Sequence, residues 1–130
     1  MSKDLRFIGK IDSSIISDYF GQLTTDSVVI TSERWNHIIM RHTHDVSLFE
    51  QYATEAVQNP DIILVDAKNA STIFVIKQIN EGVLCIVVKL VLGYTIDMKY
   101  NSVITAHRLR NRTLKQLIKK NIVLYMRCRR

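Results

Sequence analysis

Three side chains suited to proton transfer and phosphate binding, His37, Arg41 and His42, lie within six residues of the chain. An imidazole can carry a proton near neutral pH, and a guanidinium can hold a phosphate through two hydrogen bonds. The apolar residues around them recur at helical spacing, which predicts a helix over residues 33–42 with Ser32 as its cap. His37 and Arg41 then lie one turn apart on a polar face. The alternative interpretation is an amphipathic helix whose polar face is merely solvated.

His42 differs from the other two side chains because it trails on the apolar side of this helix. At 3.6 residues per turn, about 140° separates it from His37, so both rings cannot point to solvent. Because His42 lies at the helix end, we expect the chain to unwind there and turn this ring toward a sheet. This position favours His42 as the proton-transfer group, with Arg41 as phosphate clamp and His37 or His107 as alternatives.

The charged residues are distributed unevenly along a chain of 130 residues with a net charge of +6. Residues 1–106 contain nine Lys and Arg and all twelve Asp and Glu, a net −3, whereas residues 107–130 contain nine Lys and Arg and no acid, a net +9. A block this basic indicates a polyanionic partner, either nucleic acid or an anionic membrane, or else a solvated tail that aids solubility. The length and a hydrophobic content of 47% fit one domain over residues 1–130.

Neither a metal site nor a membrane segment is expected from the motifs present. Cys85 and Cys128 form no disulfide framework or zinc pattern. His42 and His44 could be drawn as a metal pair, but no His-Glu-x-x-His or Cys-x-x-Cys motif supports it, so we expect no metal and no cofactor. We expect no signal peptide, because the first residues are mixed and charged, and the longest apolar run, 83–92, is too short to span a bilayer. We therefore expect an intracellular site of action and no membrane partner.

Turn residues and apolar periods divide the chain into the helices and strands that must position these groups. We predict helices over 13–20, 33–42, 47–59 and 112–120, the first three capped by Ser13, Ser32 and a capping box of Ser47 and Glu50. We predict strands over 5–8, 28–31, 61–66, 72–79, 83–92, 102–107 and 122–125, with residues 80–82 as a hairpin turn. Helices first and strands afterwards indicate an α+β fold, an antiparallel sheet backed by helices, with a short basic C-terminal helix.

Such a sheet usually leaves its other face open, and strand alternation predicts which side chains line it. We expect polar and basic side chains there, with two arginines at the edge: Lys77, Lys89, Thr105 and His107, then Arg108 and Arg110. The alternative is that these are ordinary strand residues, the lysines extending their ends to solvent from half-buried positions.

Two motifs in the first half of the chain resemble known nucleases. They are Ile30-Thr-x-Glu33-Arg34-x-x-His37-Ile38-x-x-Arg41-His42 and, after Glu55, Asn59-Pro60-Asp61-x-Ile63. Together with the stretches 88–90, 101–110 and 114–125, they are similar to the barnase–EndoU–colicin–RelE nuclease superfamily, in particular to its phage-encoded and polymorphic-toxin members. The resemblance spans residues 28–125 and would make them the core of a nuclease-like domain.

The resemblance implies N-terminal helices packed on a four- to five-stranded antiparallel sheet and a metal-independent ribonuclease. The RNA 2′-hydroxyl would attack its own phosphodiester, leaving a 2′,3′-cyclic phosphate and a 5′-hydroxyl. The helix motif implies His37, Arg41 and His42 as catalytic residues, and the strand motif implies Thr105 and Lys89, to which we add His107 from its strand position. Which group is base and which is acid stays open. We expect the RNA backbone to be held by basic side chains: Arg108, Arg110, Arg112, Lys115 and Lys119.

The main hypothesis is an endoribonuclease toxin that cleaves tRNA or other RNA. A toxic nuclease needs an inhibitor, so we expect an acidic immunity protein or antitoxin as partner. The toxin would act in the cytoplasm, either freestanding or delivered there as the C-terminal part of a secreted effector. The alternatives are a non-catalytic RNA-binding module and a protein-binding adaptor whose basic tail meets an acidic protein.

Overall fold

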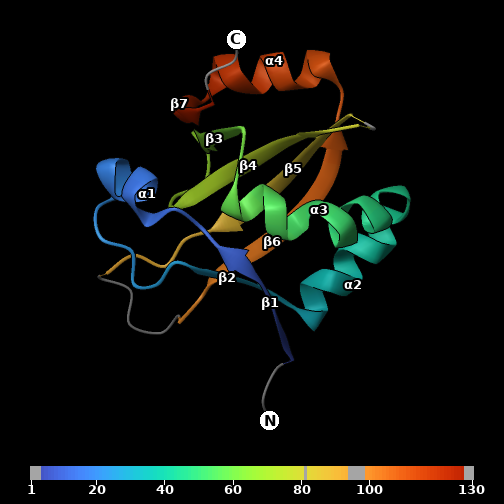
Figure 1. Cartoon of the computed structure of the whole chain (residues 1–130), viewed down its shortest axis with the longest axis horizontal. Helices are drawn as coiled ribbons and strands as arrows, with labels where there is room; N and C mark the ends of the chain where they lie inside the picture. Colours follow the sequence, from blue (N-terminus) through green and yellow to red (C-terminus); the bar gives the residue numbers. More distant parts are fainter. Residues whose placement is uncertain (1–3, 81, 94–98, 128–130) are drawn as a thin grey trace.

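A seven-stranded mixed sheet is the centre of the fold in a computed structural model, which describes residues 4–80, 82–93 and 99–127 (Figure 1). The strands are β1 (Leu5–Lys10), β2 (Ser27–Thr31), β3 (Ile62–Val65), β4 (Thr72–Ile79), β5 (Gly82–Lys89), β6 (Asn101–Leu109) and β7 (Ile122–Met126). The helices are α1 (Ser13–Phe20), α2 (Ser32–Arg41), a short 3₁₀ helix η1 (Thr43–Asp45), α3 (Val46–Gln58) and α4 (Asn111–Lys120). The predicted α+β class is confirmed.

The sheet is larger than predicted, and it is not wholly antiparallel. Its strand order is β1-β2-β6-β5-β4-β3-β7. The antiparallel part runs from β6 to β7, but β2 joins β6 in parallel and β1 extends the sheet further. The buried amide of Asn101 fixes this junction, because its nitrogen donates to the carbonyls of Thr25 and Ser27 and its oxygen accepts from the Val91 backbone N–H. The prediction of four to five antiparallel strands is therefore wrong, and the first helices alternate with β1 and β2 instead of forming an N-terminal block.

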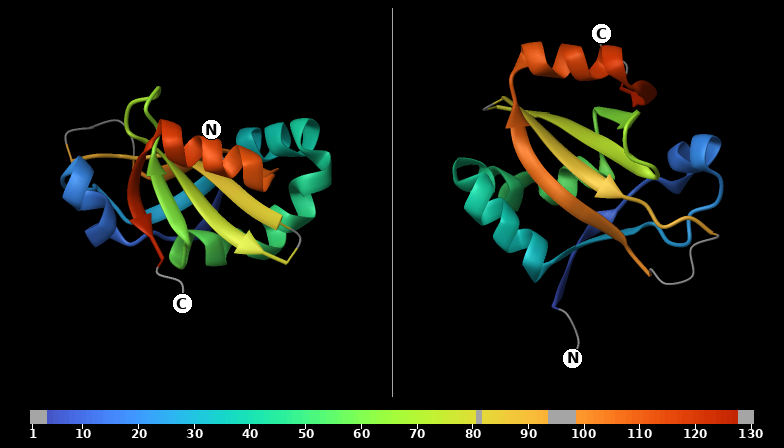
Figure 2. Two further views of the ribbon diagram at one scale, coloured as in Figure 1. Left: turned by 90° about the horizontal axis from the view of Figure 1, so that it is seen from above. Right: turned by 180° about the vertical axis from the view of Figure 1, so that it is seen from behind.

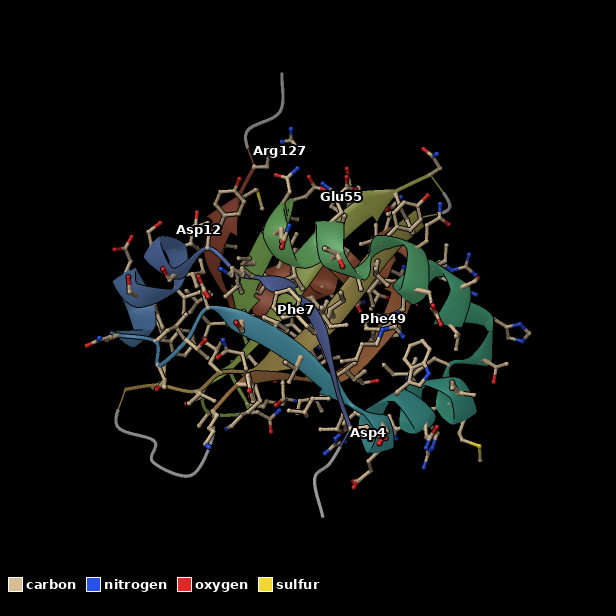
Figure 3. The ribbon with its side chains drawn as sticks, turned by 60° about the horizontal axis from the view of Figure 1, so that its bottom comes forward. Asp4, Phe7, Asp12, Phe49, Glu55 and Arg127 are labelled. Carbon is tan, nitrogen blue, oxygen red and sulfur yellow. The ribbon has the colours of Figure 1, made fainter. Side chains whose placement is uncertain are left out.

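The two faces of the sheet pack against different helices (Figures 1 and 2). The face that we call the α3 face carries Leu84, Ile86 and Val88 of β5 and packs against α1, α2 and α3. Phe49 of α3 is 1% exposed in this core, labelled in Figure 3. The opposite α4 face carries Val83 and Cys85, which pack with Leu114, Leu117 and Ile118 of α4. Alternation along each strand thus sends two apolar sets to two separate cores.

The helix caps differ from those predicted by one residue or more. Asp12 caps α1, since its carboxylate accepts from the Ser14 backbone N–H at 3.0 Å and the Ser14 hydroxyl at 2.6 Å. The hydroxyl is the main cause of the lowered pKa of Asp12. Thr31 caps α2 by accepting from the Arg34 N–H at 3.1 Å. Ser47 and Glu50 form no capping box, because η1 leads directly into α3 and Ser47 already lies inside that helix.

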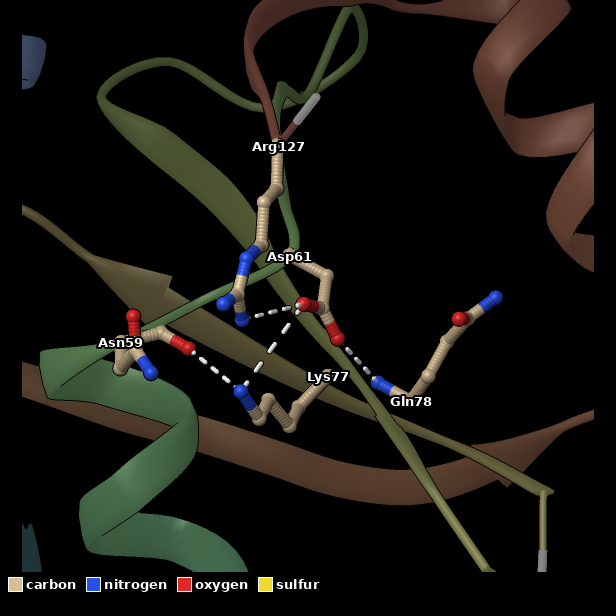
Figure 4. Close-up of polar contacts among 5 residues, drawn as sticks. All are labelled: Asn59, Asp61, Lys77, Gln78 and Arg127. Carbon is tan, nitrogen blue, oxygen red and sulfur yellow. Dashed lines mark hydrogen bonds and ion pairs between the residues drawn. The ribbon is translucent and has the colours of Figure 1, made fainter. Parts of the chain in front are cut away.

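Lys77 lies on the α3 face, so the prediction that it lines an open face is wrong. Its ammonium group is buried and donates to the Asn59 carbonyl at 2.8 Å, with the Asp61 carboxylate 3.8 Å away (Figure 4). The same carboxylate accepts from the Gln78 N–H at 2.7 Å and lies 3.6 Å from the Arg127 guanidinium. Asp61 therefore joins the end of α3, strand β4 and the residue after β7.

No helix within the described residues is both long enough and apolar enough to cross a membrane.

Candidate functional site

Three imidazole rings lie in a row where α2 meets β6. The ring of His42 stacks on that of His107, with centroids 5.3 Å apart and an interplanar angle of 25°. The ring of His37 lies edge-on to His42, with centroids 6.5 Å apart. Helix α2 ends at Arg41, and His42 leaves helical geometry with φ −131° and ψ 48°. The expected turn of the His42 ring toward the sheet is therefore confirmed.

The position of α2 follows from the short pairing between β2 and β6. The two strands pair only where Val28 and Val29 meet Asn101 and Ser102. Beyond that point the chain enters α2, and α2 and η1 run beside the remaining length of β6. Asp45 of η1 takes the place of a strand partner there, because its carboxylate accepts from the Arg108 backbone N–H at 3.1 Å.

His107 has a half-buried ring on the α4 face, opposite Cys85 of β5. Burial lowers the pKa of His107, the neighbouring His42 lowers it further, and the Asp45 carboxylate opposes the shift. Burial also raises the pKa of the Cys85 thiol to about 12, so Cys85 is not a nucleophile at neutral pH. The Nδ1 atom of His107 is buried and has no hydrogen-bond partner among the described residues. These surroundings favour a neutral His107 that supports the ring of His42.

A cleft of about 570 Å³ opens beside His42, between η1 and the junction of β6 with α4. Two imidazoles, His42 and His44, line it together with three guanidiniums: Arg41, Arg108 and Arg110. The Arg108 Nε lies 3.8 Å from the Asp45 carboxylate, and all three arginines are exposed. Guanidiniums bind phosphate oxygens, and imidazoles can give or take protons. The cleft therefore combines phosphate binding with acid–base groups.

Gly82, the first residue of β5, forms part of the cleft wall. Its φ of +135° is one that other residues rarely adopt. A Cβ there would also lie 3.4 Å from Cδ of Arg108. Glycine thus allows the tight hairpin and leaves room for the Arg108 side chain.

The predicted site residues near His42 fall into two groups. His42 and Arg41 line the cleft with Arg108 and Arg110, while His37 and His107 flank His42 without lining it.

Lys89 and Thr105 lie elsewhere on the α4 face. Lys89 donates to the Ala70 carbonyl at 2.7 Å and lies four residues along β5 from the partner of His107, about 13 Å away. Thr105 pairs with Val87, and its hydroxyl oxygen is buried without a partner in the described part of the chain. The structure does not bring these two side chains to the cleft.

Helix α4 presents its basic side chains to solvent. Its apolar residue Leu114 is buried on the α4 face, and Arg112, Lys115 and Lys119 are exposed. Asn111, the first residue of the helix, lines the cleft. The basic surface of α4 therefore begins where the cleft ends.

His44 and Asp45 are site residues that sequence reasoning missed. Both line the cleft and follow directly after His42. The sequence offered a signal, since an imidazole and a carboxylate stand in a polar break beside a candidate catalytic histidine. The predicted helices over 33–42 and 47–59 leave these residues as a connection, but they belong to η1, which packs against β6.

Comparison with known protein families, curated proteins and solved structures gives no match for this chain. Membership of the barnase–EndoU–colicin–RelE superfamily therefore stays a prediction from sequence motifs. The described residues, the three neighbouring histidines included, contain no group of three His, Cys, Asp or Glu side chains placed to hold an ion.

Proposed function

We propose that this protein is a metal-independent endoribonuclease whose active site is the cleft beside His42. The observation that carries the proposal is the fixed ring of His42 at the wall of a cleft that also contains His44 and three arginines. Phosphodiester transfer needs a base, an acid and cations around the phosphate. The cleft offers each of these from the chain itself.

In the proposed reaction, one imidazole takes the proton of an RNA 2′-hydroxyl, and that oxygen attacks the adjacent phosphorus. The bond from phosphorus to the 5′-oxygen breaks, and the second imidazole gives its proton to the leaving oxygen. The products are a 2′,3′-cyclic phosphate and a 5′-hydroxyl end. His42 and His44 are the two imidazoles, one acting as the base and the other as the acid. The charge on the phosphate is stabilised by Arg41, Arg108 and Arg110. His107 is a positioning residue, since it supports the His42 ring.

The charge distribution and the motif resemblance support RNA as the substrate. Residues 107–130 carry nine basic residues and no acid, and the exposed cations of α4 continue from the cleft. We propose tRNA or another structured RNA as target, and toxicity in the cell that makes the protein. An acidic immunity protein or antitoxin would then cover the cleft, with association accelerated by opposite charge.

Incubation of the folded protein with total RNA in EDTA tests this function. We expect cleavage without added metal, and end-group analysis should find 2′,3′-cyclic phosphates and 5′-hydroxyls. Intact RNA at high protein concentration, or cleavage that requires magnesium, would contradict the proposal. Tight, salt-dependent binding without cleavage would instead indicate the RNA-binding module, which the basic C-terminal segment also favours.

A further inference from the structure

The two sides of the molecule differ in charge. None of the seven described strands contains Asp or Glu, and neither does α4. The helices of the α3 face carry Asp18, Glu33, Glu50 and Glu55. The strands and α4 that border the α4 face therefore carry no negative charge, which suits a polyanion, and the carboxylate that lines the cleft, that of Asp45 in η1, lies 3.8 Å from the Arg108 guanidinium.

A row of paired residues crosses the α4 face at the end that α4 does not cover. Phe7 of β1 pairs with Val29, Val29 with Ser102, and Ser102 with Lys89. Paired residues point to the same side of a sheet, so Phe7 faces the same way as Lys89. Three strand spacings, about 14 Å, separate these two residues. Phe7 and the half-buried Lys89 thus stand at the two ends of the row, whose middle is less accessible, since Val29 is 4% exposed and Ser102 is half-buried.

Phe7 is exposed to an extent unusual for a phenylalanine in a strand. It is 57% exposed on edge strand β1 (Figure 3), and Tyr100, directly before β6, is 41% exposed. Val87 and Phe74, paired with each other on the α4 face, are half-buried. Single-stranded nucleic acids bind to surfaces that carry exposed rings and cations, because bases stack on the rings while phosphates meet the cations.

We infer that the row from Phe7 to Lys89 binds unpaired bases of the RNA strand whose phosphate lies in the cleft. This inference rests on the proposed ribonuclease function and adds single-stranded RNA as the substrate class. Ser102 lies five residues from His107 along β6, about 16 Å, a distance that a few nucleotides can span. Helix α2 runs beside this part of β6, so the RNA strand would pass between α2 and α4. A paired duplex hides the faces of its bases and could not stack on Phe7.

The test compares binding of a 2′-O-methyl RNA strand, which has no attacking hydroxyl, with binding of the same strand annealed to its complement. Phe7→Leu keeps an apolar side chain but removes the ring, and Phe7→Trp keeps a ring. Tyr19→Leu is the matched control, because Tyr19 is 50% exposed on α1, which packs on the α3 face. Thermal melts establish that each variant is folded.

Phe7→Leu should weaken binding of the single strand about tenfold or more, as loss of one stacked base does, and leave duplex binding unchanged. Phe7→Trp and Tyr19→Leu should bind as wild type does. RNA should quench the fluorescence of Phe7→Trp more than that of wild type, whose sole tryptophan is Trp35.

If Phe7→Leu and Tyr19→Leu bind the single strand with equal affinity, the inference is overturned. The proposed ribonuclease function would still hold in that case, provided that the wild-type protein cleaves RNA. Loss of a dimer in Phe7→Leu, measured by sedimentation, would instead assign the row to a second copy of the chain. A wild-type protein that neither binds nor cleaves RNA would overturn both proposals together.

Discussion

The ring of His42 stacks on the ring of His107, with centroids 5.3 Å apart. This pair joins the residue after α2 to strand β6, so it links the helix motif to the sheet. It also places a ring that lines the cleft against a ring whose pKa is lowered by burial. The stack therefore fixes the orientation of His42 without adding a positive charge behind it near neutral pH.

The lowered pKa of His107 predicts a pH dependence of stability. Between the folded pKa and the ordinary value of 6.5, the unfolded chain binds more protons at this residue than the folded chain does. The free energy of unfolding should therefore fall as the pH decreases below about 6.5. His107→Phe keeps a ring against His42 but cannot titrate, so thermal melts of this variant should show a weaker loss over the same range. If the melting temperatures of the two proteins fall equally as the pH decreases, His107 is not the cause of the loss of stability.

The Asp61 cluster predicts a large stability difference between two charge-removing substitutions. Asp61→Asn leaves the buried Lys77, whose side chain is 8% exposed, without its counter-charge. Removing one partner of a buried pair costs about 3 kcal/mol or more. Arg127→Gln removes a partner whose side chain is 54% exposed, which should change the free energy of unfolding by less than about 1 kcal/mol. Denaturant unfolding measures the free energy of unfolding of both variants. Equal losses would show that Asp61 is not needed to stabilise the buried charge of Lys77.

The exposed lysines of α4 should contribute to RNA affinity and not to the chemical step. Lys115→Gln and Lys119→Gln should each weaken binding and reduce the salt dependence by about one unit per lost phosphate contact. The single-turnover rate at saturating RNA should stay near that of wild type. Lys68→Gln is the control, since Lys68 is exposed in the connection between β3 and β4. A large fall in the saturated rate for Lys115→Gln would place that lysine in the active site instead.

The spacing of apolar and turn residues predicted most of the helices and strands, because each of these elements depends on residues close together in the chain. Helix α1 has the predicted bounds, and the hairpin of β4 and β5 forms around Gly82 as its turn residues indicate. The parallel junction of β2 with β6 could not be predicted in this way. It depends on Asn101, which joins segments 10 to 76 residues away in sequence through its buried amide.

Only the part of the candidate site that depends on local spacing was predicted from the sequence. His42 and Arg41 belong to one helix end, so their proximity follows from spacing alone. The stacking of His42 on His107 needs the long-range placement of α2 beside β6, which no local pattern contains. Lys89 was assigned to the site by its position in a motif, yet its side chain is held by the Ala70 carbonyl.

The proposed role of His42 is tested most directly by comparing RNA cleavage by His42→Ala and His37→Ala. Both rings belong to the group of three neighbouring imidazoles, but of the two only His42 lines the cleft. His42→Ala should lose cleavage activity by about 10²-fold or more, as removal of a general acid or base does, with a thermal melt close to that of wild type. His37→Ala should lose much less. Unchanged cleavage by His42→Ala, or a collapsed melt that accounts for its loss, would contradict a catalytic role for this residue.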